Sequence, residues 1–376
     1  MENSSVFSAP GRTEIGGNHT DHQHGRVLAA AVDLDVRATV TPNADGLIRV
    51  RSEGYEPFEV DLKQLEPVPA EKNSSRALVR GVAAGIAARG HKITGFDAEI
   101  ISTVLPGSGL SSSAALEVLI ATIINELDHC GLSAVEIAQI GQYAENVYFG
   151  KPSGLMDQTA SAVGNLLAID FADPAEPVVR PLNVDFGAFH HSLCIIDSGA
   201  DHAGLTDEYA AITAELKKLC GFFGKEYLRD VDEGEFYAAV PALRERVGDR
   251  AVLRAMHVFE ENRRVTAQVE ALETGDFDRF LELIKASGRS SWTYLQNVVP
   301  AGSTVRQELA LALALCEKAL HGRGACRVHG GGFAGTIQAF VPEDMLREFQ
   351  TEMEGYLGAG SCRVLHIRPE GGIRER

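Results

Sequence analysis

The chain has 376 residues, 45% of them hydrophobic and 23% charged, a globular composition with room for two domains of ordinary size. Its formal net charge of −17 argues against nucleic acid or an anionic membrane as the main partner, although a nucleotide needs only a local positive site. The scattered cysteines, the missing leader peptide and the missing membrane span together predict a cytoplasmic protein with reduced thiols.

The first half of the chain alternates β-prone segments with glycine-rich loops and small-residue helices. We expect strands at residues 6–10, 26–41, 47–60, 95–104 and 166–171. We expect helices at about 76–89, 114–127, 134–148 and 155–163. The run Asp173-Pro-Ala-Glu-Pro177 then interrupts the pattern. It predicts a division into one domain at 1–175 and a second at 176–376.

The second half is mostly helical. A buried strand at 192–197 is followed by helices at about 203–220, 233–247, 250–273, 276–287 and 303–320. A final β-type segment covers residues 327–341. Strands and helices in this order predict an α+β protein.

The segment Leu105–Glu117 has the composition of an anion-binding loop. It reads Leu-Pro-Gly-Ser-Gly-Leu-Ser-Ser-Ser-Ala-Ala-Leu-Glu, between a β-prone run and a long apolar helix. In this arrangement backbone N–H groups and the positive end of the helix dipole attract phosphate. The segment lacks the Lys-Ser/Thr ending of a P-loop and the GxGxxG of a dinucleotide site. The alternative is a serine-capped helix after a tight turn, although a cap uses one serine rather than three.

Two more polar, glycine-rich segments lie far from this loop in the sequence. One covers residues 11–25, and the other covers residues 329–335 after a long run of predicted helices. Such segments are either independent turns or backbone loops that converge on one small, highly charged ligand. The second explanation predicts a binding site assembled from distant parts of the chain.

All three segments resemble the motifs of the GHMP family of small-molecule kinases. Residues 105–115 are similar to the family's ATP loop, and Gly330-Gly-Gly-Phe-Ala-Gly335 resembles its third motif. Gly11-Arg-Thr-Glu-Ile-Gly-Gly-Asn-His-Thr-Asp21 resembles the galactokinase signature Gly-Arg-x-Asn-x-x-Gly-Glu-His-Thr-Asp-Tyr. Gly154-Leu-Met-Asp-Gln158 resembles the galactokinase Gly-x-Met-Asp-Gln. Shorter matches occur at Ala144–Asn146, Asp207–Tyr209 and Glu261–Val265.

The resemblance implies an α+β, two-domain GHMP kinase fold with the active site in the cleft between the domains. It also implies an ATP-dependent sugar 1-kinase of the galactokinase type, which transfers a phosphoryl group from ATP to the anomeric hydroxyl of galactose. The expected partners are the sugar, ATP and Mg²⁺, with no nucleic acid and no membrane. The expected assembly is a monomer or a weak homodimer.

The resemblance assigns catalysis to Asp157 and Arg12. Asp157 would face the sugar C1 hydroxyl as its base or orienter, whereas a lone aspartate is ordinarily solvated or a helix cap. Arg12, otherwise a surface cation, would hold that carboxylate ionised and stabilise charge on the transferred phosphoryl group.

The other site residues implied by the resemblance bind nucleotide, metal and sugar. The nucleotide-binding residues would be Pro106, Gly107, Ser108, Gly109, Leu110, Ser111, Ser112 and Ser113. Magnesium would be bound by Ser113 and Glu145, a sparse set that suits an ion keeping phosphate oxygens and waters. The alternative for Glu145 is a solvated helix glutamate.

The sugar-binding residues would be Asn18, His19, Asp21, Gly154 and Tyr209. Tyr209 also lies in register with an apolar helical stripe, so a core position with a solvated hydroxyl is equally open.

Several positions depart from the galactokinase pattern. Glu14 replaces the signature asparagine, Asn18 replaces the sugar-contacting glutamate, and His22 replaces the tyrosine. In the third motif His329 precedes the glycines and Ala334 replaces one of them. Asparagine is neutral and donates as well as accepts, so it does not repel a carboxylate. Three alternatives follow: a tolerated variation in a galactokinase, a kinase for a relative such as galacturonate, or a sugar and ATP sensor without turnover.

Overall fold

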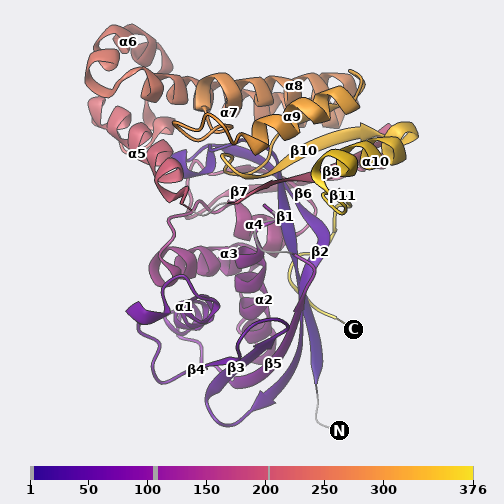
Figure 1. The fold of residues 1–376 in the computed structure, drawn as a ribbon. Helices are drawn as coiled ribbons and strands as arrows, with labels where there is room; N and C mark the ends of the chain where they lie inside the picture. Colours follow the sequence, from indigo (N-terminus) through magenta and orange to yellow (C-terminus); the bar gives the residue numbers. More distant parts are fainter. Residues whose placement is uncertain (1–3, 105–108, 202–203, 376) are drawn as a thin grey trace.

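The computed structural model describes residues 4–104, 109–201 and 204–375, and it contains two sheets with helices packed on both (Figure 1). Within these residues the larger sheet has eight strands, in the order β12-β1-β2-β5-β3-β4, with β6 paired to β2 and β7 paired to β6. The strands are β1 Ser5–Gly16, β2 Arg26–Asn43, β3 Leu47–Ser52, β4 Phe58–Asp61, β5 Gly95–Ser102, β6 Leu166–Asp170, β7 Val178–Leu182 and β12 Ile373–Arg374.

Four helices lie on one side of this sheet (Figure 1). They are α1 Ser75–Ala87, α2 Ser112–Leu127, α3 Ala134–Tyr143 and α4 Met156–Val163. The central helix α2 packs against β1, β2 and the other three helices. It is apolar on most of its surface, which is typical of a helix buried on all sides. These contacts hold α2, and with it the first turn of the helix, in place between the larger sheet and the other three helices.

The smaller sheet has its four described strands in the order β11-β8-β10-β9. They are β8 His191–Ala200, β9 Ala325–Val328, β10 Gly335–Pro342 and β11 Cys362–Leu365. Alternate residues of β8 enter different cores, as the two-residue period of a strand requires. Leu193 and Ile195 belong to the core that includes α8 Phe277–Ser290, whereas Cys194 and Ile196 face α9 Glu308–Ala319 and α10 Leu346–Leu357.

Three further helices form an arm with a core of its own (Figure 1). They are α5 Thr206–Phe222, α6 Glu233–Val247 and α7 Asp249–Thr274. The long helix α7 leaves this arm and packs against β1 and β2. It thereby connects the arm to the strand that carries the first glycine-rich motif.

The observed elements agree with the predicted α+β order, with three differences. The expected strands did not include β7 and ended at residue 341, so β7, α10, β11 and β12 were not anticipated. Strand β1 continues to Gly16, so residues 11–16 are extended rather than part of a loop. The division at 175–176 falls in the connection between β6 and β7, which pair within the larger sheet. Because β12 also returns to pair with β1, the larger sheet takes strands from both proposed halves. The division itself stays a prediction.

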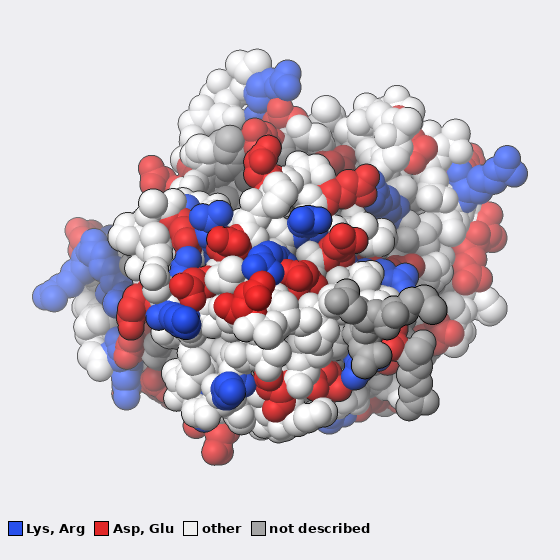
Figure 2. Space-filling view, turned by 90° about the horizontal axis from the view of Figure 1, so that it is seen from below, with Lys and Arg blue, Asp and Glu red and all other residues white. Residues whose placement is uncertain are grey.

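The surface charges are mixed on the face shown in Figure 2. Lysine and arginine side chains there are interspersed among aspartate and glutamate side chains rather than gathered in one band. In the part of the chain that the structure describes, no helix is both long enough and apolar enough to span a bilayer.

Candidate active site

Arg12 in β1 and Asp157 in the first turn of α4 form a bidentate ion pair. Arg12 Nε lies 2.6 Å from Asp157 Oδ1, and Nη2 lies 2.9 Å from Oδ2. The third nitrogen, Nη1, donates to the carbonyl of Gly109 at 2.6 Å. The side chains are 7% and 23% exposed. The pairing therefore fixes the plane of the carboxylate while leaving part of it accessible.

The surroundings of Asp157 keep it ionised. Burial alone would raise its pKa, but the charge and hydrogen bonds of Arg12 and a hydrogen bond from Ser111 outweigh burial and lower the pKa below its ordinary value. Arg12 is buried as well, and its pKa is raised because the charge of Asp157 overcomes the cost of desolvation. The pair thus presents a negative oxygen next to a permanent cation.

The described part of the ATP loop, residues 109–113, leads directly into α2. Ser111 has a left-handed backbone (φ 57°) and makes no capping hydrogen bond with its side chain. Its hydroxyl donates instead to Asp157. The Arg12 N–H donates to the carbonyl of Leu110 at 3.0 Å, which ties the loop to β1. The simple serine cap is therefore absent at Ser111. Three of the predicted nucleotide ligands, Pro106, Gly107 and Ser108, lie outside the described residues.

Gly109 brings the ATP loop against the third motif. A Cβ at this position would lie 2.5 Å from Thr336 Oγ1 and 3.0 Å from His329 Nδ1, and its φ of +72° also favours glycine. His329 is buried, and its Nε2 accepts from the Glu14 N–H at 3.2 Å. Nδ1 then carries the proton and donates to Thr336 Oγ1 at 3.0 Å. Burial, aided by two neighbouring arginines, lowers the pKa of His329 well below its ordinary value. This neutral imidazole joins the first motif to the third.

The two predicted metal ligands meet at the start of α2. Ser113 Oγ donates to Glu145 Oε1 at 3.1 Å, and the Glu145 side chain is only 2% exposed, so it is not a solvated helix glutamate. Glu145 lies in a π-helical turn, Ala144–Phe149, a type of turn often found at functional sites. Within the described residues, no group of three or more His, Cys, Asp or Glu is arranged to hold a metal ion. One hydroxyl and one carboxylate nevertheless fit the chemistry of Mg²⁺ held largely by phosphate and water.

Asp21 lies directly over Gly154, close to the Arg12–Asp157 pair. A Cβ at Gly154 would collide with the Asp21 carboxylate, so this glycine makes room for the aspartate. Burial raises the pKa of Asp21 to about 6, and the charge of Asp157 adds to the rise. Two carboxyl groups with different pKa values therefore lie side by side.

His19 and Tyr209 both bond to the third motif. His19 Nε2 lies 3.0 Å from the carbonyl of Gly331, and the Tyr209 hydroxyl donates to the carbonyl of Gly332 at 2.8 Å. Since a carbonyl only accepts, His19 Nε2 carries the proton and Nδ1 accepts from His22 Nε2 at 3.1 Å. Burial, followed by the effect of His22, lowers the pKa of His19 to about 3. The Gly331 carbonyl thus fixes the tautomer of His19, and this in turn requires His22 Nε2 to carry a proton. Tyr209 packs beside the core of the arm, and its hydroxyl is bonded to the motif rather than left to solvent, while its contact with a sugar stays a prediction.

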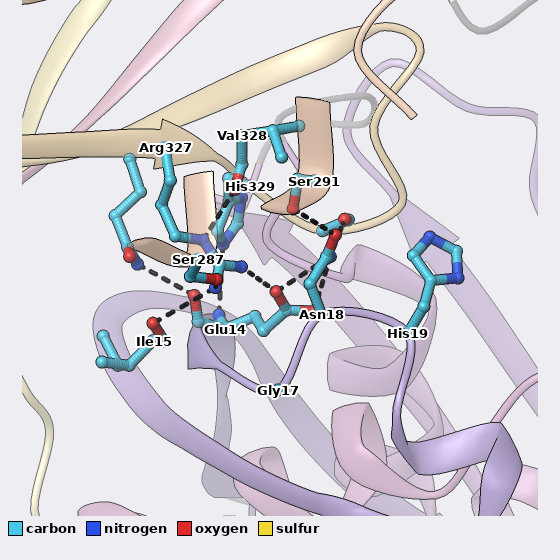
Figure 3. Close-up of polar contacts among 12 residues, drawn as sticks. Glu14, Ile15, Gly17, Asn18, His19, Ser287, Ser291, Arg327, Val328 and His329 are labelled. Atoms are coloured by element: carbon cyan, nitrogen blue, oxygen red, sulfur yellow. Dashed lines mark hydrogen bonds and ion pairs between the residues drawn. The ribbon is translucent and has the colours of Figure 1, made fainter. Parts of the chain in front are cut away.

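Asn18 differs from the expectation that it faces the sugar (Figure 3). It is fully buried, and its Nδ2 donates to Glu14 Oε1 at 3.1 Å and to the Gly330 carbonyl at 2.6 Å. Its Oδ1 accepts from Ser291 Oγ at 3.2 Å and from Asn297 Nδ2 at 3.0 Å. Both ends of the amide are therefore bonded to protein. In this structure Asn18 joins the first motif to the third and offers no free group to a ligand.

Glu14 and Asn18, the two exchanged residues of the first motif, are in direct contact through a hydrogen bond (Figure 3). Glu14 forms an ion pair with Arg327 of β9, and both side chains are buried. Burial raises the pKa of Glu14, while the charges of Arg327 and Arg12 oppose the rise. The exchange of residues thus places the carboxylate at position 14, against an arginine of the smaller sheet, and leaves a neutral amide at position 18. This explains physically why Asn18 turns inward.

Helix α7 supplies residues whose role was missed in the sequence. Glu261 accepts from the backbone N–H groups of Gly17 at 3.2 Å and Asn18 at 3.5 Å. Its carboxylate is held ionised, because Arg264 and other positive neighbours outweigh burial and lower its pKa to about 2. Asn262 accepts from the Arg26 N–H at 2.7 Å. The only signal was the short match at residues 261–265, which carried no assigned role.

Two more residues around Glu145 were also missed. Lys151 Nζ lies 3.3 Å from Glu145 Oε1, and Gln158 Nε2 donates to Glu145 Oε2 at 2.9 Å. Gln158 also donates to the buried carboxyl group of Glu117 at 2.9 Å. Burial, followed by the charge of Glu145, raises the pKa of Glu117 well above its ordinary value. Both oxygens of Glu145 are therefore oriented by neighbouring side chains.

Known proteins share both the sequence motifs and the fold. Residues 77–165 match the family profile "GHMP kinases N terminal domain", and residues 2–42 match the "Galactokinase galactose-binding signature". The structure of Lactococcus lactis galactokinase complexed with galactose matches with a TM-score of 0.84 at 26% identity, over 99% of this chain and 95% of that one. Methanococcus jannaschii mevalonate kinase shares the fold with a TM-score of 0.68 at 14% identity, over 96% and 98% of the two chains.

These matches confirm the predicted GHMP kinase fold. A galactokinase of Streptomyces coelicolor is 33% identical over 381 aligned positions, which cover 99% of this chain and 94% of that relative. The alignment therefore extends over both halves of the chain. The chain belongs to the galactokinase family of GHMP kinases, which are ATP-dependent phosphotransferases.

Proposed function

We propose that this chain phosphorylates the C1 hydroxyl of galactose with ATP, yielding galactose 1-phosphate and ADP. The observation that carries the proposal is the Arg12–Asp157 pair beside the start of α2. An ionised carboxylate that remains 23% exposed suits a group that must meet a substrate hydroxyl. The adjoining helix start suits the phosphates of the donor.

Each residue has a role that follows from its surroundings. Asp157 accepts the hydrogen bond of the C1 hydroxyl and takes up or orients its proton. Arg12 holds Asp157 and stabilises negative charge on the transferred group. The residues 109–113 and the helix start hold the phosphates.

The sugar is held by Asp21, beside Gly154, and by the hydroxyl of Tyr209. His19, whose two ring nitrogens are bonded to Gly331 and His22, fixes the loop that carries Asp21. The carboxylate of Asp21 accepts paired hydrogen bonds from neighbouring sugar hydroxyls. Asn18 acts behind them, by fixing the loop to the third motif. The earlier hypothesis of a galacturonate kinase depended on a free Asn18 amide, so galactose is the acceptor that we propose.

Ser113 and Glu145 are the residues that would hold Mg²⁺, which neutralises phosphate charge when it is bound. We further propose a monomer or weak homodimer in the cytoplasm. The six cysteines, all within the described residues, are free thiols, which supports a reducing compartment.

The test measures ADP formation with ATP and Mg²⁺ in the presence of galactose, galacturonate, glucuronate, glucose or N-acetylgalactosamine. Galactose should give the fastest turnover, and Asp157→Asn should abolish it while nucleotide binding persists. Faster turnover on galacturonate would contradict the proposed acceptor. ATP binding without turnover on any of the sugars would instead support a sensor of sugar and ATP.

A further inference from the structure

Lys151 is held over Glu145 by the backbone of its own loop. The π-helical turn ends at Gly150 (φ +87°), where the N–H groups of Gly150 and Lys151 donate to the Glu145 carbonyl at 2.9 and 3.1 Å. The Ser153 N–H then donates to Asn146 Oδ1 at 2.8 Å, which closes the loop. The position of the Lys151 backbone is therefore determined locally and not by its side chain.

The ammonium group of Lys151 covers the open side of a buried carboxylate. Nζ lies 3.3 Å from Glu145 Oε1, the same oxygen that accepts from Ser113 Oγ at 3.1 Å. The Glu145 side chain is 2% exposed, whereas that of Lys151 is 59% exposed. A partly exposed ammonium group thus contacts an almost fully buried carboxylate oxygen that also accepts from the start of α2.

Lys151 differs from Arg12 in how far its hydrogen-bond donors are used. Arg12 already directs all three of its nitrogens to Asp157 and Gly109. Among the described residues, Glu145 is the only hydrogen-bond partner of Lys151 Nζ. An ammonium group has three N–H donors, so two remain for a ligand.

We propose that Lys151 is a second phosphate-contacting cation of this site, a role that rests on the proposed kinase function. In the ligand-free protein its ammonium neutralises Glu145. When the nucleotide binds, Lys151 leaves Glu145, one of the residues that would hold Mg²⁺, and donates to an oxygen of the terminal phosphate. A compact charge on a flexible four-carbon stem suits such a change of partner better than a rigid guanidinium fork. The signatures that identified the site do not include this residue.

Calorimetric titration of a non-hydrolysable ATP analogue in the presence of Mg²⁺ tests the proposal without turnover. Lys151→Met should weaken binding of the analogue about tenfold, the size of one charge-assisted hydrogen bond. Adenosine should bind equally to variant and wild type, and Lys151→Arg should retain most of the affinity because it keeps the charge. Lys285→Met is the matched control, since Lys285 pairs with Glu282 on α8. Its affinity should equal that of the wild type.

Equal affinity of Lys151→Met and wild type for the analogue would overturn the inference and leave Lys151 as a surface counterion. An equal loss for adenosine and the analogue would also overturn it, because the effect would then act through the fold. If the wild type binds the analogue through Lys151 but phosphorylates no sugar, the proposed function fails and this inference stands.

Discussion

Two arginine–carboxylate pairs arise from neighbouring positions of the same strand and differ in their access to solvent. Arg12 of β1 reaches across to Asp157 in α4, and Glu14 of β1 reaches Arg327 in β9. The side chains of the first pair are 7% and 23% exposed, and those of the second are 0% for Arg327 and 4% for Glu14. The local chemistry is the same, but only one of the pairs can meet a substrate.

We interpret this difference as one between the pair that we propose takes part in the reaction and a structural pair. In the first pair the pKa of the carboxyl group is lowered, because the arginine and a serine outweigh burial. In the second pair burial dominates and raises the pKa of Glu14. Removing one partner of a fully buried pair leaves an uncompensated charge, which is strongly destabilising. We therefore expect changes in the first pair to affect turnover and changes in the second to affect stability.

The largest effect is expected from Arg12→Leu. Turnover should fall about 10³- to 10⁵-fold, the range seen when an arginine that stabilises a transferred phosphoryl group is lost. The fold should persist, since Asp157 remains partly exposed to water. Steady-state kinetics and thermal unfolding measure the two properties, with Arg323→Leu as the control in an exposed pair with Asp344. Wild-type turnover in Arg12→Leu would contradict the proposal that the first pair serves turnover and the second serves stability.

Arg327→Leu should act on the other property. We expect a loss of about 3–5 kcal/mol in the free energy of unfolding, because Glu14 would stay buried without its partner. Adding Glu14→Leu should recover most of that loss, since an apolar pair of similar size replaces the ion pair. Urea unfolding of both variants measures this. A single variant as stable as the wild type, or a double variant weaker than the single, would contradict the structural role.

Local signals in the sequence predicted the elements with clear ends. Helix α6 occupies the expected residues, because Asp232 caps its start through the Glu235 N–H and Gly248 follows its end. Helix α10 was missed because the predicted elements ended at residue 341, although its buried residues Phe349 and Met353 have the spacing of one helical turn. A short amphipathic helix of this kind is stabilised by the sheet on which it packs.

For the site, the motifs predicted which residues meet but not how they are bonded. The resemblance brought Arg12 to Asp157, and the structure has them in contact. It did not bring Glu14 to Arg327, which is 313 residues away and close only because β1 packs against the smaller sheet. Because the Glu14–Arg327 pair could not be predicted, the inward orientation of the Asn18 side chain could not be predicted either. The residue type at a position thus indicated which interactions its side chain can make, while the direction in which the side chain points depended on tertiary packing.

Asn18→Asp tests the contact between the exchanged residues Glu14 and Asn18, and its expected effect on the free energy of unfolding is smaller. The new carboxylate would face Glu14 and would lose the donor that Glu14 and Gly330 share, so we expect a cost of about 1–3 kcal/mol. Repulsion raises the pKa of the new group above its unfolded value, so stability is lost as pH rises, and the cost should be larger at pH 8 than at pH 5. Adding Glu14→Gln should recover part of it. A cost independent of pH would argue against contact between the two groups.

Asp21 has features of both kinds of pair, because it is partly covered and none of the arginines that the structure describes bonds to it directly. Its folded pKa of about 6 lies above the ordinary 3.8. A raised pKa means that the stabilising contribution of the group is complete below the unfolded value and is lost as pH rises through about 6. Asp21→Asn should therefore flatten the dependence of unfolding free energy on pH between about 4 and 6. Urea unfolding across this range measures the slope.

The same titration predicts a change in sugar use. If Asp21 accepts sugar hydroxyls as a carboxylate, kcat/KM for galactose in the wild type should decline as pH falls below about 6, while nucleotide affinity changes little. Asp21→Asn should have a low kcat/KM without this decline, since its side chain does not titrate. An acid limb that persists in the variant would assign the decline to another group, and Asp157 would then be the first to test. In that case Asp21 would belong with Glu14, as a carboxylate that shapes the site without meeting the substrate.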